Sequence, residues 1–84
     1  MASYLLNVKI TPREGLLDPE GKAVEHALQS LGFQGAEGVR VGKLIRLRLS
    51  AADEADARRQ GDEMCRKLLA NPVTEDYAIA LEEA

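Results

Sequence analysis

The spacing of hydrophobic residues changes several times along this 84-residue chain, and that alternation limits the possible folds more than any other feature. Three stretches alternate apolar and other residues with the period of two typical of strands, and two stretches have the helical spacing of three and four. Their order is strand, helix, strand, helix, strand. Because a chain of this length has room for one domain, we expect residues 1–84 to form a single α+β unit.

The three strand-like stretches are expected over about Ser3–Thr11, Val39–Ser50 and Thr74–Leu81. Gly42-Lys43 interrupts the second stretch, and we interpret it as a bend within one long strand. The alternative is a tight corner between two short strands, which gives the ferredoxin-like order β-α-β-β-α-β. That corner would leave its first strand very short, so the long bent strand is preferred.

Both helix-like stretches have an apolar side. Asp18 is suited to cap the first helix and Pro19 to begin it, while Gly32 is suited to end it. Its apolar stripe consists of Val24, Ala27, Leu28 and Leu31. The second helix is expected over about Asp53–Ala70, and its inner face consists of Ala57, Gly61, Met64, Cys65 and Leu68. Gly61 is a poor helix former, so we expect it to serve tight packing of this helix on its neighbours. The pattern therefore predicts a two-layer sandwich, with a small antiparallel sheet and two helices on one face.

Cysteine and histidine usage limits how so small a domain can be stabilised. Cys65 is the only cysteine and His26 the only histidine, so neither a disulfide within the chain nor a Cys/His metal cluster is expected. Short chains bury a small share of their surface, and association with other chains is a common remedy. No apolar run is long enough to span a bilayer and no signal-peptide pattern is visible, so we expect a cytoplasmic protein.

No motif for catalysis or cofactor binding emerges. Cys65 is interpreted as an apolar core residue, His26 as a surface residue, and Asp18 as a helix cap rather than half of an acid pair with Glu20. Four basic residues remain of interest, because they suit either a phosphate or acidic partner or a solvated strand edge: Arg40, Lys43, Arg46 and Arg48. The net charge of −3 and the lack of aromatic residues among them argue against nucleic acid.

Three segments resemble those of a known family. Residues 15–21 (GLLDPEG) resemble the GVLDPQG segment of the PurS family, and residues 39–43 (VRVGK) resemble its V-R-x-G-K segment. Residues 65–77 (CRKLLANPVTEDY) resemble its C-x-K-L-L-A-N-P-V-I-E-D-Y segment, which is the longest and most specific match. The departures are Leu16 for Val, Glu20 for Gln and Thr74 for Ile, and none removes a group that catalysis needs.

The resemblance implies a non-catalytic subunit of phosphoribosylformylglycinamidine synthase, an enzyme of purine biosynthesis. A PurL subunit carries the ATP-dependent amidation and a PurQ subunit releases ammonia from glutamine. The small subunit holds these two together and forms dimers or tetramers. No cofactor or metal is expected in this chain itself, since ATP, Mg and glutamine bind to the larger subunits.

A partner-facing surface is the site we expect in place of an active site. We assign to it Gly42-Lys43, Asn71-Pro72-Val73 and their neighbours: Arg40, Gly42, Lys43, Asn71, Pro72, Val73, Asp76 and Tyr77. Two other classes compete with the subunit interpretation. One is a small oligomeric regulatory module with a ligand pocket between subunits, and the other is a nucleic-acid-binding domain that uses the basic residues.

Overall fold

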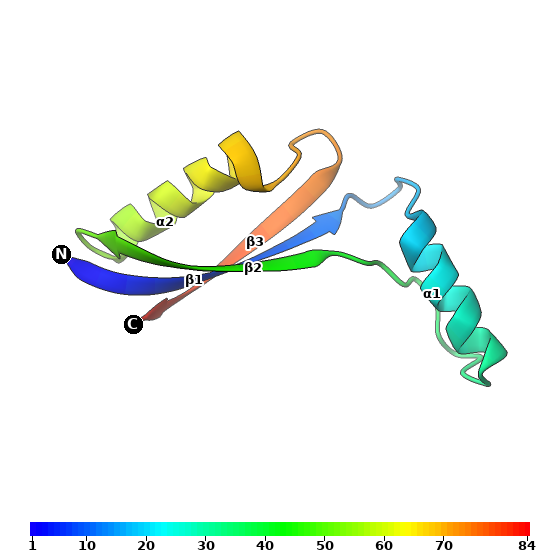
Figure 1. Ribbon diagram of the computed structural model, residues 1–84. Coiled ribbons are helices and arrows are strands. Elements are labelled where there is room, and N and C mark those ends of the chain that lie inside the picture. The colour runs from blue at the N-terminus through cyan, green and yellow to red at the C-terminus, as the bar shows by residue number, and fades with distance from the viewer.

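The computed structural model describes all residues from 1 to 84. The elements, in chain order, are β1 (Ala2–Pro12), α1 (Pro19–Ser30), β2 (Lys43–Ala51), α2 (Glu54–Met64), the π-helical turn η1 (Cys65–Leu69) and β3 (Glu75–Glu83). The strands form one three-stranded sheet, and Figure 1 shows that α2 lies over this sheet while α1 lies beyond its end. The sheet order is β2-β1-β3, and both strand pairs are antiparallel. The predicted α+β class and antiparallel sheet are confirmed.

Strand β1 forms the centre of the sheet and of the core. Its alternate side chains are buried, as its period of two predicts: Tyr4, Leu6, Val8 and Ile10. Helix α2 lies across this face of the sheet (Figure 1). Gly61 permits the close approach, because a Cβ atom at that position would lie 2.7 Å from Leu6 Cδ2. The expectation that Gly61 serves tight packing is therefore confirmed.

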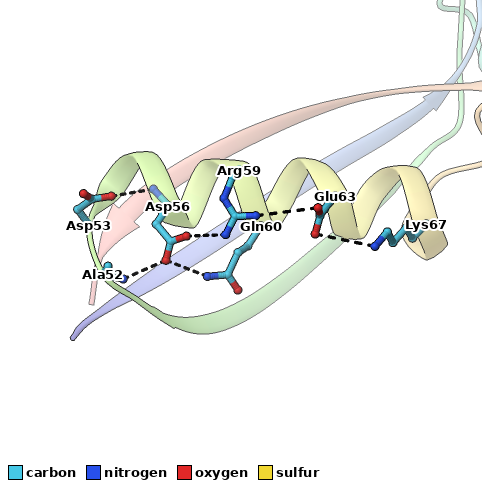
Figure 2. A network of polar contacts seen from close by, with 7 residues as sticks. All are labelled: Ala52, Asp53, Asp56, Arg59, Gln60, Glu63 and Lys67. Carbon is cyan, nitrogen blue, oxygen red and sulfur yellow. Dashed lines mark hydrogen bonds and ion pairs between the residues drawn. The ribbon is translucent and has the colours of Figure 1, made fainter.

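The outer side of α2 is polar, and Figure 2 shows a series of hydrogen bonds and ion pairs along the helix. Asp53 caps the helix by accepting a hydrogen bond from the Asp56 amide (2.8 Å). Asp56 pairs with Arg59 at 2.7 Å, and Glu63 contacts both Arg59 and Lys67 at 3.9 and 4.0 Å. Such exposed pairs contribute little each, and they keep this side of the helix in solvent.

Helix α1 does not cover the sheet, which corrects the predicted placement of both helices on one face. In Figure 1 it projects beyond the end of the sheet, on the far side from the N-terminus. The molecule is correspondingly extended, at 51 × 26 × 14 Å. Its radius of gyration is 16.2 Å, whereas a compact domain of this length has a value of about 12 Å. We call residues 19–42 the arm and the rest of the chain the body.

The second strand is shorter than predicted, because it begins at Lys43 rather than near Val39. The backbone before Lys43 forms hydrogen bonds within the arm instead of with the sheet. The Val39 amide donates to Glu25 Oε1 (3.3 Å), and the Val41 amide donates to Asp18 Oδ2 (2.9 Å). Neither the long bent strand nor the ferredoxin-like hairpin is present.

Helix α2 ends in a wider turn than the helical pattern predicts. The Ala70 amide donates to the Cys65 carbonyl oxygen (3.0 Å), which closes the π-helical turn η1. The extra residue in this turn shifts the helical phase. Cys65 stays buried, but Leu68, expected on the inner face, is 82% exposed. None of the helices has the length and apolar content needed to cross a bilayer.

Candidate functional site

The residues predicted to face partners gather at one end of the sheet, where the body meets the arm. Lys43 lies opposite Ile10 on the central strand, and Ile10 lies opposite Tyr77 on β3. Lys43 Nζ is 4.0 Å from Glu75 Oε2, so the starts of β2 and β3 are joined across the end of β1. We call this region, formed by residues 11–13, 42–43 and 71–77, the loop end.

The turn between η1 and β3 is held by its own hydrogen bonds. Asn71 Oδ1 accepts from the Val73 amide (2.9 Å), and the Asn71 amide donates to Glu75 Oε1 (2.7 Å). The Glu75 amide also donates to the Asn71 carbonyl oxygen (2.8 Å). The turn thus presents the Val73 side chain, which is 75% exposed, from a fixed backbone.

Arg13 is a residue of the loop end that sequence reasoning missed. Its Nη2 donates to the Pro72 carbonyl oxygen (2.6 Å), and its Nε lies 3.5 Å from Asp76 Oδ1. Its backbone amide donates to the Thr74 carbonyl oxygen (2.9 Å). Arg13 therefore ties β1 to the turn before β3. The sequence alone gives no signal for this role. It follows from the register of β1 and β3, which pairs Pro12 with Glu75 and so places Arg13 beside the turn.

Arg40 and Asp18 fasten the two ends of the arm together. The Arg40 guanidinium donates to the carbonyl oxygens of Leu16 (3.1 Å) and Pro12 (3.4 Å), and also to that of Arg13. Asp18 accepts from the Gly21 amide (3.0 Å) and the Val41 amide (2.9 Å). These hydrogen bonds hold the pKa of the Asp18 carboxyl below its usual value, and the one from Gly21 has the largest effect. The predicted cap is confirmed, and it also links the start of the arm to its end.

The other basic residues are divided between two surfaces. Lys43 belongs to the loop end, next to Gly42, where an added Cβ atom would clash with the Ile10 carbonyl oxygen. Arg46 lies within β2, where its Nε donates to Asn7 Oδ1 (2.9 Å) across the strand pair. Since Arg40 donates to backbone carbonyls, the four residues do not form one common anion site.

The sequence matches the family model described as PurS, phosphoribosylformylglycinamidine (FGAM) synthase, over residues 5–83. This chain belongs to the PurS family. It is 48% identical to the PurS subunit of FGAM synthase from Synechocystis over 79 residues, which is 94% of this chain and 79% of that protein. It resembles the solved structure of Thermus thermophilus PurS with a TM-score of 0.86 and 41% identity, covering 98% of each chain. It also matches a chain in the structure of PurLQS from Thermotoga maritima with a TM-score of 0.87, 27% identity and full coverage of both chains.

The candidate nucleophile and bases of this PurS chain are not assembled into a catalytic arrangement. Cys65 is buried, and burial raises the pKa of its thiol, which keeps it protonated and unreactive. His26 is exposed on α1, in the arm rather than the body. The Tyr77 hydroxyl donates to Asp62, which raises the pKa of Tyr77. No three His, Cys, Asp or Glu side chains lie together as a metal site.

Proposed function

We propose that this chain is the non-catalytic PurS subunit of an FGAM synthase, which holds a PurL synthetase and a PurQ glutaminase together in the cytoplasm. The observation that carries the proposal is the full-length match to a chain of the PurLQS structure, at a TM-score of 0.87. In this proposal, ATP, Mg and glutamine bind to the larger subunits. The small subunit contributes by fixing their relative positions, so that ammonia passes between their sites.

We propose the loop end as the surface that meets a larger subunit. Its turn is fixed by the hydrogen bonds of Asn71 and Arg13, so binding would cost little conformational entropy. It presents an apolar side chain, Val73, beside the charged pair Lys43–Glu75. Interfaces between proteins commonly combine an apolar centre with a charged rim of this kind.

Reconstitution of the enzyme from its separate subunits tests the proposed function. Partner PurL and PurQ subunits should form FGAM with glutamine as the nitrogen source only after this chain is added. With ammonium chloride as the nitrogen source, PurL should depend on this chain far less, since no transfer between subunits is then required. Full glutamine-dependent activity of PurL and PurQ without this chain would contradict the proposal.

Charge reversal at Lys43 tests the proposed surface separately. Lys43→Glu should weaken assembly with the larger subunits about tenfold, because it places two acidic groups, residue 43 and Glu75, side by side at the contact. Arg48→Glu is the matched control, since Arg48 is an exposed residue of the same strand outside the loop end. Sedimentation velocity of the mixed subunits measures the difference. Equal affinity for both variants would remove Lys43 from the interface.

A further inference from the structure

A polar hollow lies at the loop end, where the last residues of the arm meet the end of β1. It has a volume of about 560 Å³, and none of the residues that line it is hydrophobic: Thr11, Pro12, Arg13, Glu14, Arg40 and Asp76. Two of these residues are arginines and two are acids, so the formal charges of the lining balance. Ligand sites in proteins are lined mainly by apolar side chains. A ligand in this hollow is therefore recognised by its charges and hydrogen bonds.

Backbone carbonyl groups hold both arginine side chains of the hollow in place. Arg40 donates to three of them through Nη1 and Nη2, which leaves its Nε–H unused. Arg13 donates to the Pro72 carbonyl oxygen through Nη2, and its Nη1 makes no hydrogen bond. A guanidinium group has five N–H donors in one plane, so each arginine keeps donors for a further acceptor. Because both side chains are already ordered, little conformational entropy is lost when they bind one.

One cation and one carboxylate of the hollow have no partner of opposite charge. Arg13 lies 3.5 Å from Asp76 Oδ1, but the acceptors of Arg40 are all neutral carbonyl groups. Glu14 is exposed and forms neither an ion pair nor a side-chain hydrogen bond. Arg40 and Glu14 line the same hollow without pairing with each other. A small molecule that carries both a negative and a positive group can therefore bridge them.

We propose that the polar hollow binds a free α-amino acid through its carboxylate and ammonium groups. Arg40 and Arg13 receive the carboxylate, whose planar shape matches a guanidinium group. Glu14 receives the ammonium group. A ligand with one charge of each sign suits a lining whose charges balance, whereas a phosphate ester would bring further negative charge to the two acids. The inference concerns this chain alone and holds whether or not the loop end meets a larger subunit.

NMR titration of the full-length chain with L-glutamine and two analogues tests the class of ligand. L-Glutamine is the probe because its side chain is uncharged, and it should shift the Arg13, Glu14 and Asp76 amide signals saturably. N-acetyl-L-glutamine lacks the ammonium group and L-glutaminamide lacks the carboxylate. Each should bind about tenfold more weakly, because one charged group of the hollow is left without its partner. No saturable shift with L-glutamine, or equal affinity for all three compounds, would overturn the proposal.

Removal of one charge from the hollow tests where the amino acid binds. Glu14→Gln should leave the amide spectrum of the unliganded chain almost unchanged, since the Glu14 side chain is exposed and unpaired. It should weaken L-glutamine binding about tenfold. Glu37→Gln is the matched control, because Glu37 is an exposed acid of the arm that does not line the hollow. If both variants bind L-glutamine with the affinity of the unchanged chain, the ligand does not lie in the hollow and the proposal fails.

Discussion

Helices α1 and α2 are nearly equal in length, and both have an apolar side, yet only α2 lies on its own sheet. The difference comes from their connections. Helix α2 follows β2 after two residues, and Asp56 accepts from the Ala52 amide (3.1 Å), so the helix turns directly back across the sheet. Helix α1 instead begins at Asp18, whose carboxylate accepts from the Gly21 and Val41 amides and so ties the start of the arm to its end, beyond the sheet. An apolar stripe indicates that a helix can pack against another element, while the connections determine where the helix lies.

A large truncation in the body should have the greatest effect on stability. Leu6→Ala removes a fully buried side chain beneath Gly61, which should cost about 2–5 kcal/mol in the free energy of unfolding. Leu44→Ala, at a position 54% exposed on the other face of the sheet, should cost less than about 1 kcal/mol. Urea denaturation at one fixed protein concentration compares them. Similar costs would mean that the α2 face is not the core of the body.

Overpacking at the contact between α2 and the sheet should have the next largest effect. Gly61→Val places new methyl groups against Leu6 and Ile79, and we expect a loss of about 1–3 kcal/mol. Gly35→Val in the arm is the control, because a Cβ atom added at position 35 would meet nothing within 4 Å. The change at position 35 should leave the urea midpoint nearly unaltered. An unchanged urea midpoint for Gly61→Val would show that α2 can move away from β1. Helix α2 would then not be held tightly on the sheet, and it would differ less from α1 than we infer.

The sequence predicted well those features that depend on local periodicity. The buried side of β1, the Asp18 cap and the close packing at Gly61 all follow from spacing and residue type. The position of the arm could not be predicted, because two apolar surfaces in one pattern do not reveal whether they meet within one chain or between two. The exposure of Leu68 was missed for a different reason, since one extra residue in the π-helical turn changes the helical phase without a sequence signal.

The loop end was predicted only in part. The resemblance of residues 39–43 and 71–77 to a family pointed to segments that the strand register then brings together. It gave no indication that Arg40 would donate to three backbone carbonyls or that Arg13 would hold the turn. Long flexible side chains in loops have many possible partners, and the choice among them is made by the folded backbone rather than by sequence spacing.

The smallest effect should come from acid. It should be confined to Asp18 and its hydrogen-bond partners at the start and end of the arm, and it should leave the body unchanged. The pKa of the Asp18 carboxyl is held low in the folded chain by the Gly21 and Val41 amides, whereas it is about 3.9 when unfolded. The ionised carboxylate therefore stabilises the folded state fully above about pH 4, and this stabilisation is lost as the pH falls through the lower folded pKa. A carbon-detected NMR titration should give Asp18 a midpoint below 3.9, with the Gly21 and Val41 amide shifts following it and the Leu6 methyl shifts unchanged. Asp18→Asn should abolish that amide titration. An Asp18 midpoint at its ordinary value would mean that the two ends of the arm are not joined through this carboxylate.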